Sequence, residues 1–205
     1  MPRQTRQIHL ASASPRRHEL LERAGVPVRV VRSGLDDGRL RSGSTDPVGW
    51  TMALAYLKAR AGLERTEDGE VVLGADTMVV KDDRMIGQPL DADDARRILG
   101  ELSDGEHTVV TGVAMVWRAE GELQRVVFAD VARVRVGRLE PEMIERYIES
   151  GQWVGKAGAY NLMERVAAGW PIEWDGDPGT IMGLPMDRLR PMLDGVLDGT
   201  GVQQG

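Results

Sequence analysis

The chain has 205 residues, a formal net charge of −6 at pH 7 and no cysteine. Without cysteine it forms no disulfide and no thiolate metal site, and its acidic balance argues against a general nucleic-acid binder. Met1 to Gln7 is polar and lacks the apolar core of a secretion signal, and no apolar stretch reaches membrane-spanning length. We therefore expect a cytoplasmic protein with a single domain over residues 1–195 and a flexible tail over 196–205.

The first third of the chain predicts short strands separated by two helices. Ser14 is a good helix N-cap, Pro15 suits a first helical turn and Gly25 stops a helix. Asp46 and Pro47 begin a second helix, whose apolar residues recur at helical spacing. The expected strands are 8–11 and 28–32, the expected helices are 15–24 and 47–63, and 33–45 is expected to form a mobile surface loop.

The remainder of the chain predicts longer strands and three further helices. Val71 to Ala75 is a continuous apolar run, typical of a buried strand, and it ends at Asp76. Asp82 and Asp83 separate two β-favouring segments, as in a hairpin. The other expected elements are antiparallel strands 107–117 and 123–136, helices 91–102, 140–150 and 186–193, and a strand and loop over 170–180. This pattern predicts an α/β fold with a mixed twisted sheet flanked by helices.

The first of three segments with candidate chemistry is Leu10 to Arg17. A strand, a turn of small residues and a helix N-terminus leave free N–H groups and a positive dipole, which favour an anion. The hydroxyls of Ser12 and Ser14 are donors that suit phosphate oxygens. The guanidinium groups of Arg16 and Arg17 suit them as well. The same pattern is also that of an ordinary capped surface helix with solvated arginines.

The second and third segments are Gly74 to Thr77 and Lys156 to Tyr160. Asp76 follows a buried strand, where the ligand crevices of α/β proteins lie. Such an aspartate could bind a divalent cation or accept a proton from water, and it could equally make a strand-terminal turn. Small residues after Lys156 allow close backbone approach to a phosphate, although a tight loop has the same composition.

Taken together, these segments resemble the Maf family of nucleotide pyrophosphatases. Leu10 to Arg17 is similar to the opening signature of that family. The resemblance spans roughly Ile8 to Leu193, and its further segments, in order, are 54–59, 73–77, 107–113, 156–160 and 183–185. It implies two lobes around a nucleotide-binding cleft, hydrolysis of nucleoside triphosphates to a monophosphate and pyrophosphate, a divalent cation (Mg²⁺ or Mn²⁺) and a homodimer.

The resemblance also implies roles for individual residues. Asp76 is the implied catalytic acidic residue, acting as a proton acceptor or metal ligand, and Asp37 is a second implied metal ligand. Lys58 and Lys156 match the catalytic lysines of the family. The implied phosphate-binding residues are Ser12, Ser14, Arg16 and Arg17.

Four more positions are assigned to substrate binding by the resemblance. The branch acting on dTTP and UTP typically has threonine after the catalytic aspartate, and Thr77 stands there. Gln88 replaces the lysine of a usual Gly-Lys-Pro segment. Met163, with Glu164 beside it, replaces a glutamine or glutamate that helps to select the substrate. Asp37 belongs to an Asp-Asp pair where the family often has a glutamate.

Two functions of different classes follow. The first is a nucleoside triphosphate pyrophosphatase with no nucleic-acid or membrane partner. The alternative is a non-catalytic nucleotide-binding regulator, related to cell division and septum formation, and the replacements at Gln88 and Met163 motivate it. His9, His18 and His107 are interpreted as structural or surface side chains without a catalytic role. The rings of Trp170 and Trp174 are interpreted as packing groups, with base stacking as the alternative.

Overall fold

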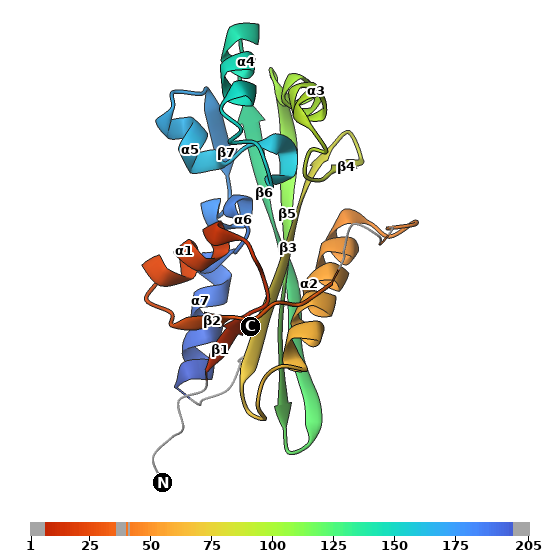
Figure 1. Cartoon of the computed structure of the whole chain (residues 1–205), viewed down its shortest axis with the longest axis vertical. Coiled ribbons are helices and arrows are strands. Elements are labelled where there is room, and N and C mark those ends of the chain that lie inside the picture. The colour runs from red at the N-terminus through yellow and green to blue at the C-terminus, as the bar shows by residue number, and fades with distance from the viewer. Residues whose placement is uncertain (1–6, 36–39, 41, 199–205) are drawn as a thin grey trace. The chain divides into compact units, whose positions relative to one another are not determined.

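The computed structural model describes residues 7–35, 40 and 42–198. Its strands are β1 (Ile8–Leu10), β2 (Val28–Val30), β3 (Val71–Lys81), β4 (Arg84–Ile86), β5 (Gly105–Ala119), β6 (Glu122–Val136) and β7 (Ile172–Asp175). Its helices are α1 (Pro15–Arg23), α2 (Pro47–Leu63), α3 (Ala92–Leu102), α4 (Pro141–Glu149), the 3₁₀ turn η2 (Ala157–Ala159), α5 (Leu162–Ala167), α6 (Pro178–Met182) and α7 (Met186–Leu197) (Figure 1).

The strands form one mixed sheet in the order β2-β1-β3-β5-β6-β7, with β4 paired to β3. β1 runs parallel to β2 and β3, whereas β4 and β7 pair antiparallel with their neighbours. β5 and β6 are joined by Glu120 and Gly121, which both have positive φ, as a two-residue antiparallel hairpin requires. The prediction of an α/β fold with a mixed sheet and flanking helices is confirmed.

The chain divides into two compact units. The first comprises Met1–Asp76, Thr111–Asp130 and Gly183–Gly205, and the second comprises Thr77–Val110 and Val131–Met182. β3, β5 and β6 contribute residues to both units. The single domain over 1–195 and the tail over 196–205 stay predictions.

In the first unit, β1 and residues 71–76 of β3 are buried on both faces. Leu10 and Leu73 pack with residues of α1 and α7 in one apolar cluster. Val72 points to the opposite face and packs with Ala55 and Ala59 of α2. Figure 1 shows α2 on one side of β3, with α1 and α7 on the other. Burial on both faces explains why the strand core reads as a continuous apolar run rather than an alternating one.

The second unit has its own core. Apolar residues of β3 and β5 pack in one cluster with side chains from α3, α4 and the segment around η2. Leu99 and Leu102 of α3 are almost fully buried there, and so is Leu162 at the start of α5. The second unit therefore has an apolar core of its own beneath the loops that it carries.

Two predicted elements end at least four residues too early, and three short helices are additional. β3 does not end at Asp76 but continues to Lys81, because the segment after Asp76 pairs with β4 through a turn at Asp82 and Asp83, both with positive φ. α7 continues past Leu193 to Leu197, since Val196 is only 1% exposed in the apolar cluster of the first unit. The helices that periodicity did not predict are η2, α5 and α6, which are too short to show it.

Candidate active site

The candidate site of the first unit lies where two parallel strands end together. Leu10 of β1 pairs with Leu73 of β3, and the Ala11 amide donates to the Leu73 carbonyl over 2.8 Å. Ser12 therefore leaves β1 at the end toward which β3 carries Asp76. Ligand sites of α/β sheets lie outside such carboxyl ends.

The connection from β1 to α1 is held by its own polar groups. The Ser12 hydroxyl accepts from the Ser14 amide over 3.2 Å and from the Arg17 guanidinium over 3.0 Å. Arg17 also donates from Nε to the Gly183 carbonyl over 2.9 Å and is only 9% exposed. Ser14 takes the expected N-cap position, but its hydroxyl makes no capping bond. Arg17 thus organises the turn, while Ser14 and Arg16 stand at its half-buried edge.

Gly74 lets α2 pack closely against β3. A Cβ atom there would lie 2.3 Å from the Ala55 carbonyl oxygen and 2.7 Å from the Ala59 amide nitrogen. Gly112 of β5 meets α2 in the same way, since its Cβ would lie 2.4 Å from the Thr51 carbonyl. The alternation of side chains along β3 then directs Asp76, like Gly74, toward α2.

This close approach brings Lys58 to Asp76. The Lys58 ammonium donates to Oδ1 of Asp76 over 2.7 Å, and the two side chains are 14% and 12% exposed. A nearly buried carboxylate needs a counter-charge, and Lys58 provides it. The structure therefore brings together two of the three residues that the sequence predicted to be catalytic.

One of the two predicted metal ligands, Asp76, lies among the described residues. No cluster of three or more His, Cys, Asp or Glu side chains suited to a metal occurs in the described ranges. Asp37, one of the two predicted ligands, lies outside the described residues. Asp76 offers a single carboxylate, which fits a Mg²⁺ ion that takes most of its ligands from substrate phosphates and water.

The chain is similar in sequence to known proteins over almost its whole length. Residues 7–196 match the family model described as Maf-like protein. The chain belongs to the Maf family. A protein of Symbiobacterium thermophilum named dTTP/UTP pyrophosphatase is 41% identical over 187 residues, covering 91% of this chain and 92% of that protein. Proteins with the same name from Pelotomaculum thermopropionicum and Xanthomonas campestris are each 38% identical, over 92% and 91% of this chain and 95% and 96% of their own lengths.

The second unit of this Maf-family chain carries the remaining predicted residues. The Lys156 ammonium forms an ion pair with the Glu164 carboxylate, which lies on α5. The Lys156 side chain is 12% exposed and the Glu164 side chain is 43% exposed. Met163 is 37% exposed, and Gln88 is exposed in the loop between β4 and α3. Lys156 thus positions Glu164, and the sequence did not predict this ion pair.

The histidines of this Maf-family chain have structural contacts, in line with their interpretation from the sequence. His9 lies 3.0 Å from the Glu70 carboxylate, and His107 shares a buried hydrogen bond of 2.8 Å with the Tyr160 hydroxyl. Burial, with a smaller contribution from the charge of Lys81, lowers the pKa of His107 to about 4. Burial also raises the pKa of Tyr160 above its ordinary value. Both partners of the His107–Tyr160 bond are therefore neutral near pH 7.

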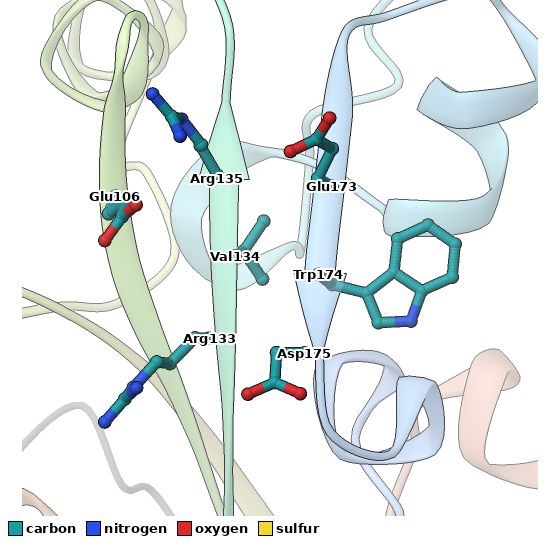
Figure 2. Close-up of a pocket in the computed structure, with 7 residues that line it drawn as sticks. All are labelled: Glu106, Arg133, Val134, Arg135, Glu173, Trp174 and Asp175. Atoms are coloured by element: carbon teal, nitrogen blue, oxygen red, sulfur yellow. The ribbon is translucent and has the colours of Figure 1, made fainter.

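A pocket of about 310 Å³ in the second unit is lined by residues of β5, β6 and β7 (Figure 2). Arg133 and Arg135 of β6 stand in register with Asp175 and Glu173 of β7, and Glu106 of β5 completes the charged lining. Three carboxylates against two guanidinium groups do not suit a polyphosphate. Among the described residues, none predicted to bind substrate lines this pocket.

The two tryptophans differ in their surroundings. Trp170 is 6% exposed and packs edge-on against the Tyr147 ring at 5.2 Å, which confirms a packing role. Trp174 is 38% exposed and contributes to the charged pocket. Figure 2 shows its ring on the side of β7 that faces away from β6. No helix within the described part of the chain has both the length and the apolar character needed to cross a membrane.

Proposed function

We propose that this chain hydrolyses pyrimidine nucleoside triphosphates, dTTP and UTP, to the monophosphate and pyrophosphate. Water attacks the α-phosphorus, the bond between that phosphorus and the α–β bridging oxygen breaks, and pyrophosphate leaves. The observation that carries the proposal is the nearly buried Lys58–Asp76 pair beside the Ser12–Arg17 turn. The names of the Maf-family relatives support the same reaction class and the same bases.

Asp76 acts as the proton acceptor in this proposal. A carboxylate within hydrogen-bonding reach of the attacking water takes its proton as the new P–O bond forms. Lys58 holds one oxygen of the carboxylate, at 2.7 Å, and so fixes the direction of the other. Lys58 is therefore a positioning residue as well as a source of positive charge in the site.

Phosphate binding is assigned to the Ser12–Arg17 turn and to Lys156. The N-terminus of α1 presents amide groups and the positive end of a helix dipole to an anion. Arg16 adds a guanidinium group, whereas Arg17 acts through Ser12 and the Gly183 carbonyl, which it holds in place. In the second unit, Lys156 is a separate candidate, whose ammonium group can bind a phosphate oxygen once Glu164 gives way.

A divalent cation completes the proposal. When bound, Mg²⁺ or Mn²⁺ supplies a positive charge that offsets the negative charge developing on the departing pyrophosphate. Asp76 is the described carboxylate that would hold it, and Asp37 is the second candidate from the sequence.

Base preference rests on two positions of the second unit. Thr77 follows Asp76 in β3, as in the branch that acts on dTTP and UTP. Met163 presents an exposed thioether side chain where the family usually has a polar group, so we assign it to apolar contact with the base. The location in the cytoplasm and the homodimer stay predictions, and light scattering of the purified chain tests the second.

A nucleotide panel tests the proposed function. The purified chain is incubated with dTTP, UTP, CTP, ATP, GTP and 7-methyl-GTP in the presence of Mg²⁺ or Mn²⁺, and released pyrophosphate is measured. We expect the highest kcat/KM with dTTP and UTP. Saturable nucleotide binding in calorimetry without any pyrophosphate release would instead support the non-catalytic regulator, which the relatives do not favour.

A further inference from the structure

The turn from Lys156 to Tyr160 has a strained backbone, which requires contacts from outside the turn to stabilise it. Gly158 has φ +68° and Ala159 has φ +64°, so two successive residues occupy the left-handed region. A Cβ atom on Gly158 would lie 2.7 Å from Val79, which excludes other residues there. An alanine in this region is strained, and such strain persists only where surrounding contacts impose it.

Tyrosine hydroxyl groups supply two of these contacts. The Tyr160 hydroxyl shares a 2.8 Å hydrogen bond with His107 of β5, and the rings meet edge-on at 86°. The Tyr147 hydroxyl of α4 donates to the Ala159 carbonyl over 3.0 Å. All three side chains, His107, Tyr147 and Tyr160, are at most 6% exposed.

The same turn is linked to the loop that carries Gln88. The Gly158 amide donates to the Gly87 carbonyl over 3.0 Å, and the Ala159 amide donates to the Lys156 carbonyl over 3.0 Å. The peptide bond between Gly87 and Gln88 is therefore held by the turn. Two side chains assigned to the substrate, Lys156 and Gln88, thus depend on one strained backbone.

We propose that His107, Tyr160 and Tyr147 are positioning residues that hold the Lys156 ammonium group in place for the phosphates of the substrate. This inference rests on the proposed function and deepens it, because none of the three touches the reacting atoms. Their buried hydroxyl and imidazole groups impose the left-handed turn, and the turn fixes the point from which Lys156 extends. Small displacements of a charged group lower the rate of phosphate chemistry steeply.

Tyr160→Phe tests the proposal, because it removes one oxygen atom and keeps the ring. We expect kcat to fall by about tenfold, with a smaller change in KM. Tyr56→Phe is the matched control, since Tyr56 lies on α2 and the substitution keeps the ring that contacts the Arg125 guanidinium. An unchanged kcat in Tyr160→Phe would overturn the inference while leaving the proposed function intact.

A double-mutant cycle separates positioning from general stability. If Tyr160 acts through Lys156, then adding Tyr160→Phe to Lys156→Met lowers kcat/KM by no more than about twofold. If the two effects simply multiply, the tyrosine acts on stability alone and the inference is wrong. His107→Gln, which keeps a hydrogen-bonding group, should retain more activity than His107→Leu.

Amide hydrogen exchange gives a readout that does not require turnover. We expect the Gly158 and Ala159 amides to exchange at least about tenfold faster in Tyr160→Phe, because the turn loses its anchor. Unchanged exchange would overturn the inference. If the wild-type chain releases no pyrophosphate, the proposed function fails and exchange alone decides the inference. If Tyr160→Phe does not fold, Tyr147→Phe, which removes the bond to the Ala159 carbonyl, takes its place.

Discussion

The Lys58 ammonium group lies 2.7 Å from the Asp76 carboxylate, although 18 residues separate them in the chain. The pair joins α2 to β3 at the end of the sheet where the chain also leaves β1 toward α1. Each side chain is nearly buried, so neither charge is well solvated without the other. This relationship makes Asp76 the most informative position for mutation.

Asp76→Asn should abolish pyrophosphate release while preserving the fold. The amide matches the carboxylate in shape, but it is a poor proton acceptor, so we expect kcat to fall by about 10³-fold. Far-UV circular dichroism checks the fold, and pyrophosphate release checks the rate. Turnover near the wild-type rate would remove Asp76 from its proposed role.

Local sequence signals correctly predicted helix caps and a hairpin turn of this fold. Asp46 and Asp91 were expected to cap helices, and their side chains accept from the Gly49 and Asp94 amides. The hairpin at Asp82 and Asp83 was also expected and is confirmed. These features depend on residues close together in the chain, and short-range chemistry is therefore enough to specify them.

The sequence alone did not predict the contacts between residues far apart in the chain. The Arg17 guanidinium meets the Gly183 carbonyl across 166 positions, and no local pattern encodes that distance. Lys58 and Asp76 were each assigned to the site by family resemblance, but their direct ion pair follows only from how closely α2 packs on Gly74. The end of β3 was misplaced for the same reason, since pairing with β4 decides it.

Gly74→Ala should damage both stability and activity. Its new methyl group would lie 2.3 Å from the Ala55 carbonyl, so α2 must move away from β3 and take Lys58 from Asp76. We expect a loss of about 3 kcal/mol in the free energy of unfolding and at least about a tenfold loss of kcat/KM. Urea denaturation and the pyrophosphate assay measure the two effects.

Gly100→Ala provides the matched control for that substitution. Gly100 lies within α3, and a Cβ atom there would meet nothing within 4 Å. Alanine is favoured over glycine inside a helix, so the variant should be more stable by about 0.5–1 kcal/mol. If both glycine variants lose stability equally, close packing at Gly74 is not the cause.

Glu164→Gln should strengthen nucleotide binding. The Glu164 carboxylate pairs with the Lys156 ammonium group and thus competes with a phosphate oxygen for it. Removing the competing charge should lower KM by about threefold, with little change in stability because Glu164 is partly exposed. Steady-state kinetics with dTTP measures KM, and a higher KM would mean that Glu164 helps to bind the substrate.

His107 should make the stability of the chain depend on pH between about 4 and 6.5. Burial lowers its pKa in the folded state to about 4, from an ordinary value of 6.5, so the unfolded chain binds the proton first. Its contribution is therefore fully present above pH 6.5 and is lost as the pH falls toward 4. The loss amounts to about 3 kcal/mol at full protonation.

His107→Gln isolates this contribution, because glutamine does not titrate and still offers a hydrogen-bonding group to Tyr160. Urea denaturation of both proteins at pH 7, 6, 5 and 4 should show the wild type losing more stability than the variant as the pH falls. Other groups titrate equally in both proteins, so the difference between the two curves belongs to His107. Parallel curves would show that the imidazole is solvated well enough to keep its ordinary pKa, and that the bond to Tyr160 opens readily.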